Sequence, residues 1–221
     1  MNIAENIGKL RNEVPAQVKI VAVSKTRSVE DILEAYKAGQ LIFGENKVQE
    51  LISKQALLPS DIKWHFIGHL QTNKVKQIVP FVSLIQSLDS IRLLRTINKE
   101  AQLIYRSVSC LLQFHIATEE TKFGLDLNEA ETLIQVMRNE GMENVNIRGV
   151  MGMATYTENQ DLIRREFQTL RNYFSILKKA YFAADYEFSE LSLGMSGDYL
   201  LAVQEGSTMI RVGTAIFGER N

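Results

Sequence analysis

The sequence predicts an α/β fold in which one domain, residues 1–221, forms an eight-stranded (β/α)8 barrel of the TIM type. Short apolar runs rich in β-branched residues alternate with longer segments of helical period along the 221 residues. The apolar runs are nearly continuous, as expected of parallel strands that are buried on both faces. Eight such strand–helix units follow one another, which matches the repeat of the barrel. No G-x-G-x-x-G sequence follows any strand, so an open dinucleotide-binding sheet is disfavoured.

An extra amphipathic helix is predicted before the first strand. Its apolar residues recur at three- and four-residue spacing until a proline ends the helix: Ile3, Ile7, Leu10, Val14 and Pro15. The predicted strands are the apolar runs, at 19–25, 41–46, 64–69, 82–88, 107–117, 146–153, 187–194 and 208–213. The predicted helices lie between them, at 29–39, 47–58, 73–78, 90–102, 128–139, 160–180 and 197–204. Ser28 and Asp89 are the expected caps of two of these helices.

Composition and charge exclude several classes of protein. Lys and Arg number 25 and Asp and Glu 26, so the basic excess typical of nucleic-acid-binding modules is missing. No apolar run approaches the roughly 18 residues of a membrane span, and the N-terminal segment lacks the apolar core of a signal peptide. Cys110 is the one cysteine, which excludes an intramolecular disulfide or a multi-cysteine metal cluster. We therefore expect a cytoplasmic protein that binds neither nucleic acid nor membrane.

In a parallel barrel the chemistry lies at the carboxyl ends of the strands, and Lys25 occupies such a position. Lys25 ends an otherwise apolar strand. Burial there would lower the pKa of its amine and favour attack on carbonyl groups. The alternative is an ordinary lysine whose ammonium reaches solvent past the strand end.

A second group of strand-end residues is suited to an anion. Ser196 and Gly197 are predicted to begin a helix, and Gly213 with Thr214 follows the last strand, so backbone N–H groups of two adjacent units face the same mouth. The alternative is that these residues only form turns. Arg211, two residues before Gly213, projects to the same side of its strand and needs either a core carboxylate or a ligand as its partner.

These three features together fit pyridoxal 5′-phosphate (PLP). The lysine would meet the aldehyde, and the loops with Gly213, expected on the opposite side of the mouth, would hold the phosphate. Arg211, between them, would face the pyridine nitrogen. Other phosphorylated carbonyl compounds fit the same three points. His65 and His115 alternate with apolar strand residues and are interpreted as structural.

Five segments carry a resemblance to a known family. VAVSKT, FGEN-KVQE, WHFIGHLQTNK, LSLGMSGD and STMIRVGTAIFG occur in this order, and together they resemble the pyridoxal phosphate homeostasis protein family over essentially the whole chain. That family is built on the PLP-binding barrel (fold type III) of the alanine racemase N-terminal domain. Two departures are small: Leu193 replaces a common methionine, and the loop with Gly152 and Thr155 differs from the expected one.

The resemblance implies a role for each site residue. Lys25 would be the Schiff-base lysine, forming a covalent aldimine with PLP, and Arg211 would pair with the pyridine nitrogen. The remaining cofactor-binding residues are implied to lie beside the ring (Asn46), at the phosphate (Ser196, Gly213 and Thr214) or along the pocket wall (Ser192 and Met195).

The same resemblance implies a carrier that buffers PLP and delivers it to PLP-dependent apoenzymes, without evident catalysis. An arginine at the ring nitrogen leaves PLP a weaker electron sink than an aspartate would. No tyrosine base follows Lys25 in its loop, and only seven residues follow Thr214, so we do not expect the C-terminal β domain of racemases. A monomer is expected for the same reason. The alternative is a PLP-dependent amino-acid racemase or similar α-proton exchanger, and a weaker third hypothesis is a Schiff-base aldolase.

Overall fold

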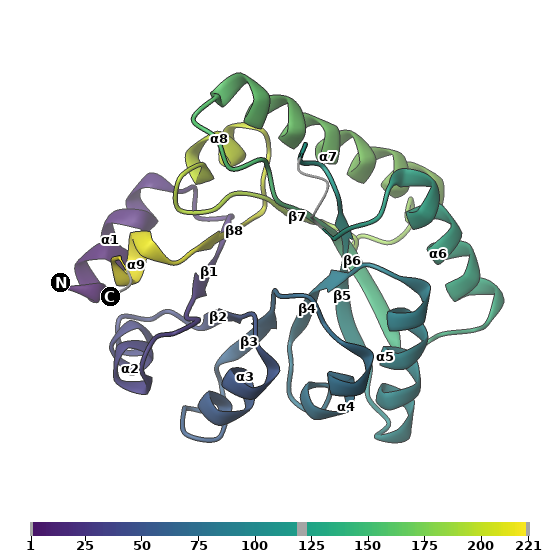
Figure 1. Ribbon diagram of the computed structural model, residues 1–221, viewed down its shortest axis with the longest axis horizontal. Helices are drawn as coiled ribbons and strands as arrows, with labels where there is room; N and C mark the ends of the chain where they lie inside the picture. The colour runs from purple at the N-terminus through teal and green to yellow at the C-terminus, as the bar shows by residue number, and fades with distance from the viewer. Residues whose placement is uncertain (1, 119–122, 220–221) are drawn as a thin grey trace.

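The computed structural model describes residues 2–118 and 123–219, and it confirms the predicted barrel. Eight parallel strands follow the order of the sequence around a closed sheet, in which the last strand pairs with the first. Figure 1 shows the strands as a central ring with the helices around it. The strands are β1 Lys19–Val23, β2 Ile42–Glu45, β3 Lys63–Phe66, β4 Leu84–Leu88, β5 Val108–Phe114, β6 Val145–Gly152, β7 Glu190–Ser192 and β8 Met209–Val212.

Helices follow the strands as the periodicity predicts. They are α1 Ile3–Glu13, α2 Val29–Lys37, α3 Val48–Gln55, the 3-10 turn η1 Thr72–Lys74, α4 Val75–Ile78, α5 Ile91–Leu103, α6 Leu127–Asn139, α7 Gln160–Tyr181, α8 Tyr199–Gln204 and α9 Thr214–Phe217. None of the helices in the described part of the chain is long and apolar enough to cross a membrane.

The predicted N-terminal helix is present as α1. It buries Ile3, Ile7 and Leu10. It packs against α2 and against α9, the short helix after β8 that the sequence patterns did not indicate. Figure 1 shows α1 and α9 side by side.

Two helix starts differ from the predicted ones. Ser90, and not Asp89, caps α5, because the Asp89 carboxylate binds His69 instead. The helix expected from residue 197 begins only at Tyr199, so Ser196 lies in the turn before it. The Asp198 carboxylate accepts from the backbone N–H of Met195 and holds that turn.

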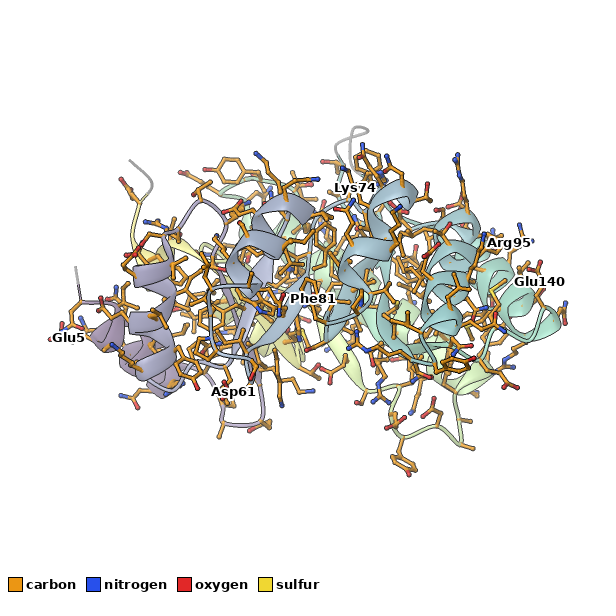
Figure 2. The ribbon with its side chains drawn as sticks, turned by 90° about the horizontal axis from the view of Figure 1, so that it is seen from below. Glu5, Asp61, Lys74, Phe81, Arg95 and Glu140 are labelled. Carbon is orange, nitrogen blue, oxygen red and sulfur yellow. The ribbon has the colours of Figure 1, made fainter. Side chains whose placement is uncertain are left out.

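The strands separate an interior from an outer core. A small cluster of buried side chains, Val21, Leu84, Leu111, Met151 and Met209, comes from alternate strand positions and fills the inside of the barrel. The larger core lies between the strands and the helices. Outside it, the ion pair between Arg95 and Glu140 joins α5 to the end of α6 (Figure 2).

The two mouths of the barrel can be told apart in Figure 2. Lys74, which follows β3, lies at the upper rim, whereas Asp61, which precedes β3, lies at the lower rim. Because all the strands are parallel, their carboxyl ends share the upper mouth, where the chemistry of such barrels is located.

Candidate functional site

A cavity of about 1070 Å³ opens at the carboxyl ends of the strands. Seven of the eight predicted site residues line it: Lys25, Asn46, Met195, Ser196, Arg211, Gly213 and Thr214. Their roles in binding remain predictions, but the fold brings their side chains or backbones to one space. Ser192 is the exception, since it is fully buried and does not line the cavity.

Arg211 forms part of the cavity wall and is held from inside the barrel. Its Nη1 donates to the carbonyl oxygen of Ser192 at 3.0 Å and to the Ser192 hydroxyl at 2.6 Å, and its Nη2 donates to the carbonyl of Gly152 at 2.9 Å. Burial lowers the pKa of Arg211 to about 10, and Asp198 partly opposes that shift. The guanidinium therefore stays charged at neutral pH. No core carboxylate forms an ion pair with it in the described residues.

The guanidinium still has donors to offer. It carries five N–H groups, and the three bonds to Ser192 and Gly152 use three of them. Among the described residues the other two have no hydrogen-bond partner. A buried cation with spare donors at a cavity wall fits a ligand that brings an acceptor atom, such as a ring nitrogen.

Ser192 lies beneath the cavity because its hydroxyl belongs to a chain of hydrogen bonds inside the barrel. It accepts from Arg211 and donates to Gln86 Oε1 at 2.7 Å, and Gln86 Nε2 lies 3.0 Å from His65 Nδ1. Because the Gln86 oxygen accepts from Ser192, the Gln86 amide nitrogen faces His65 and donates to its Nδ1. The imidazole proton is therefore on Nε2. The expectation that Ser192 lines the pocket is thus corrected to a supporting position under Arg211.

His65 is held inside the barrel by Gln86, in agreement with its interpretation as a structural histidine. Burial is the main cause that lowers its pKa to about 3, and Lys19 and Lys63 add to the effect. The ring is therefore neutral at physiological pH, which suits an acceptor for the Gln86 amide. It belongs to the barrel interior and does not line the cavity.

The anion-binding candidates form a compact group of donors. The Ser196 hydroxyl accepts from the backbone N–H groups of Gly213 at 3.1 Å and Ala215 at 3.3 Å, which joins the loops after β7 and β8. Within the described chain, the backbone N–H groups of Ser196, Gly197 and Thr214 have no partner. Three unpaired N–H groups around one loop junction fit the oxygen atoms of a phosphate.

Lys25 and this group of donors are neighbours, which corrects the expectation that they lie on opposite sides of the mouth. β8 pairs with β1, so the loops that follow the two strands are adjacent. A Cβ at Gly213 would lie 3.3 Å from the carbonyl oxygen of Val23, two residues before Lys25. The closure of the barrel places the first and last strands side by side, a contact that their order in the sequence does not reveal.

Lys25 and Asn46 follow neighbouring strands, and both are half-buried. Lys25 is therefore not the fully desolvated lysine that an apolar strand suggested. Behind Asn46 the backbone of Gly68 approaches so closely that a Cβ there would lie 2.3 Å from the Asn46 carbonyl oxygen. Only glycine fits at that point, and the contact fixes the loop that carries Asn46.

Sequence reasoning did not identify Thr155 and Phe123 as site residues, although both line the cavity. The Thr155 backbone and hydroxyl donate to the carboxylate of Glu166, at 2.7 and 2.6 Å. Glu166 lies on the buried face of α7, and a carboxylate within an apolar helical stripe is a signal that could have revealed this partner. Phe123 stacks on His69 at 4.2 Å between ring centroids, a contact between distant loops that has no local signal.

As far as the described residues show, the cavity combines a primary amine, a guanidinium with two spare donors and three backbone N–H groups without a partner. A carbonyl carbon, an acceptor nitrogen and a phosphate are the complementary groups. PLP carries all three, and the residues present fit it.

Comparisons with known proteins agree with this chemistry. The family described as alanine racemase, N-terminal domain, matches residues 1–221. The pyridoxal phosphate homeostasis protein of Pasteurella multocida is 35% identical over 100% of this chain and 99% of that protein. The protein of the same name from Aquifex aeolicus is 39% identical over 91% of this chain and 87% of its own length.

Solved structures point to the same family. PipY of Synechococcus elongatus is known without PLP (TM-score 0.90, 38% identity) and with PLP bound (TM-score 0.87, 37% identity), and each match covers 98% of this chain and 100% of PipY. Alanine racemase from Streptomyces coelicolor has a TM-score of 0.81 at 14% identity; 99% of this chain matches 58% of that enzyme, a likeness that shows the fold alone. This chain belongs to the alanine racemase N-terminal domain family and, within it, to the pyridoxal phosphate homeostasis proteins.

Proposed function

We propose that this protein binds PLP in the cavity at the carboxyl ends of the strands and carries it through a Schiff base on Lys25. The observation that carries the proposal is the grouping of Lys25, Arg211 and the unpaired N–H groups around one cavity. The PLP-bound structure of PipY, 37% identical, supports the choice of ligand. When bound, PLP supplies an aldehyde that forms an imine with a primary amine and releases one water.

The residues of this chain divide the binding between them. Lys25 offers the amine, and its half-buried position leaves it accessible to a ligand in the cavity. Arg211 donates a hydrogen bond and keeps its proton, so it holds an acceptor nitrogen without protonating it. The N–H groups of Ser196, Gly197 and Thr214 bind the anionic end.

We further propose that the protein buffers PLP in the cytoplasm and hands it to PLP-dependent apoenzymes, as a monomer, without turning over a substrate of its own. An unprotonated ring nitrogen makes PLP a poor electron sink, so the arginine supports storage more than proton abstraction. The names of the relatives, which refer to PLP homeostasis, support this role.

The first experiment is an absorbance spectrum with added PLP, before and after borohydride, followed by peptide mass mapping. We expect a yellow band that borohydride removes and a pyridoxyl mass on the peptide with Lys25. Lys25→Ala should lose the covalent label and keep part of the affinity, because the phosphate contacts remain. Lys47→Ala, an exposed lysine after the next strand, is the matched control and should be labelled like the wild type. Affinity of Lys25→Ala equal to that of the wild type would show that Lys25 is not the anchor.

The racemase alternative is tested in heavy water. The PLP-loaded protein is incubated with L-alanine and other amino acids, and α-deuteration is followed by mass spectrometry. The carrier proposal predicts no sustained exchange. Deuteration over many turnovers would establish an enzyme instead. Cleavage of sugar phosphates without a coloured cofactor would favour the aldolase hypothesis.

A further inference from the structure

The backbone around Lys25 has a conformation that its sequence does not favour. Arg27 N–H donates to the carbonyl of Ser24 at 3.0 Å, which closes a four-residue turn with Lys25 and Thr26 in its centre. Thr26 has φ of +65°. The third position of a turn with positive φ is normally glycine or asparagine, and a β-branched residue is strained there. Strained backbone of this kind persists only where surrounding contacts impose it.

A buried ammonium supplies such contacts. Lys54 of α3 is only 5% exposed, and its Nζ donates to the carbonyl oxygen of Ser24 at 2.7 Å, to Glu45 Oε1 at 2.8 Å and to Glu50 Oε1 at 2.6 Å. An ammonium has three N–H donors, so each donor of Lys54 has an acceptor. Lys54 does not line the cavity, whereas Lys25 does.

The two carboxylates extend the contact to both sides of Lys25. On one side, the Ser24 hydroxyl donates to Glu45 Oε1 at 2.6 Å. On the other side, the backbone N–H of Thr26 donates to Glu50 Oε1 at 2.5 Å. The residues before and after Lys25 are therefore tied to the same ammonium, through one oxygen of each carboxylate.

The position of this cluster is unusual for one that serves stability alone. Glu45 is fully buried, burial raises the pKa of its carboxyl, and its Oε2 has no partner in the described chain. Buried ion pairs of this kind often stabilise a fold no better than apolar side chains of similar size. Lys54, Glu45 and Glu50 do not line the cavity, so they can affect a ligand there only through the turn that carries Lys25.

We propose that Lys54, with Glu45 and Glu50, is a positioning cluster that holds the strained Ser24–Arg27 turn and thereby directs the Lys25 amine into the cavity. The claim that PLP reacts with this amine rests on the proposed function, but the positioning of the amine does not. It can be measured on the protein without PLP, as the reactivity of Lys25.

The test compares Lys54→Met with the wild type. Each protein is treated with trinitrobenzenesulfonate, and the rate of modification at Lys25 is followed by peptide mass mapping. A second series measures the rate of pyridoxyl labelling by PLP and borohydride. We expect Lys54→Met to change the rate at which trinitrobenzenesulfonate modifies Lys25 and to slow the PLP labelling by at least about tenfold. The reason is that the turn relaxes and the Lys25 amine no longer points into the cavity. Lys178→Met is the matched control, since Lys178 also donates to a backbone carbonyl, that of Phe188, away from the site.

A second substitution separates positioning from general damage. Glycine adopts positive φ without strain, so Lys54→Met combined with Thr26→Gly should recover PLP labelling to within about threefold of the wild type. Loss of structure alone would not be rescued by a glycine in a turn. Wild-type labelling in a folded Lys54→Met variant, or a double variant as slow as Lys54→Met, would overturn the proposal.

If Lys54→Met does not fold, Glu50→Ala replaces it, because the Glu50 side chain is partly exposed and its removal frees the Thr26 side of the turn, whereas a glutamine would keep an acceptor oxygen there. The same tenfold slowing and the same rescue are expected, and wild-type labelling in Glu50→Ala would overturn the proposal. A change in reagent rate at Lys25 in a protein that takes up no PLP would refute the proposed function and leave the positioning cluster standing.

Discussion

Arg211 illustrates how much of a residue's environment follows from its position in the sequence. An arginine within an apolar strand, two residues before a strand end, was predicted to reach the mouth, and it does. The pattern could not reveal that Ser192 supports it from below, because the two side chains meet across neighbouring strands inside the barrel. Alternation along one strand gives the side of the sheet on which a residue lies, and not its partner.

Arg211→Ala is expected to change the absorbance of bound PLP more than its retention. The substitution removes the donor proposed for the ring nitrogen, whereas the lysine and the phosphate contacts remain. Spectra and equilibrium dialysis on the same samples measure the two effects. Arg148→Ala is the control, because Arg148 lies at the other mouth of the barrel. An unchanged spectrum for Arg211→Ala would contradict pairing with the ring.

His65 gives a prediction on pH. Burial lowers its pKa from 6.5 to about 3. Between these values the unfolded chain binds a proton that the folded protein does not, so the histidine's contribution is complete above pH 6.5 and is lost as the pH falls towards 3. The slope is at most about 1.4 kcal/mol per pH unit.

Denaturant unfolding of wild type and His65→Gln across this pH range measures the effect. The variant should be less stable at neutral pH and lose stability less steeply on acidification, because the titrating group is gone. Equal slopes for wild type and His65→Gln would refute the prediction.

At the scale of single elements, local signals located most helices well. Ser28 was expected to cap the helix after the first strand, and it forms a capping box with Asp31 there. The prediction failed at Asp89, where a tertiary contact to His69 competes for the carboxylate and leaves the cap to Ser90. The short α9 has no side-chain cap of its own; the hydroxyl of Ser196, from another loop, accepts from the backbone N–H groups of Gly213 and Ala215 at its start.

Ser28→Ala should lower the free energy of unfolding by about 1 kcal/mol, because the Asp31 N–H loses its acceptor at 3.1 Å. Urea unfolding measures this. Ser175→Ala is the control, since that hydroxyl is exposed in the middle of α7 and donates only to the carbonyl of Arg171. Its effect should stay within about 0.5 kcal/mol. A Ser28→Ala variant as stable as the control would show that the capping box contributes little.

At the scale of the whole molecule, closure of the sheet depends on close contacts between strands. β6 bulges against β5, where Cys110 pairs with Ile147 and Leu111 pairs with Gly149. Gly149 has φ of +151°, and a Cβ there would lie 1.8 Å from the carbonyl oxygen of Glu190 in β7. Only glycine allows these strands to approach, and beyond the bulge the carbonyl oxygen of Gly152 at the end of β6 accepts from Arg211.

Gly149→Ala should therefore destabilise the protein by more than about 3 kcal/mol or prevent folding, since both the backbone conformation and the contact forbid a side chain. Gly8→Ala is the matched substitution, in the middle of α1 with nothing within 4 Å of the added methyl group. It should stabilise the protein by about 0.5–1 kcal/mol. Thermal unfolding and soluble yield compare the two. A well-folded Gly149→Ala variant would mean that β6 and β7 tolerate a wider separation.

The sequence by itself determined the alternation of strands and helices, the closed barrel that eight such units form, and the strand ends at which Lys25, Asn46 and Arg211 lie. These features follow from local periodicity and from the rule that parallel strands share one mouth. The tertiary structure decided which of these ends are neighbours. Closure of the barrel set Lys25 beside Gly213, placed Ser192 beneath Arg211 and brought Lys54 of the next unit under the turn that carries Lys25. Some of these partners lie almost the whole length of the sequence apart, and only the packing of complete helices and strands brings them together.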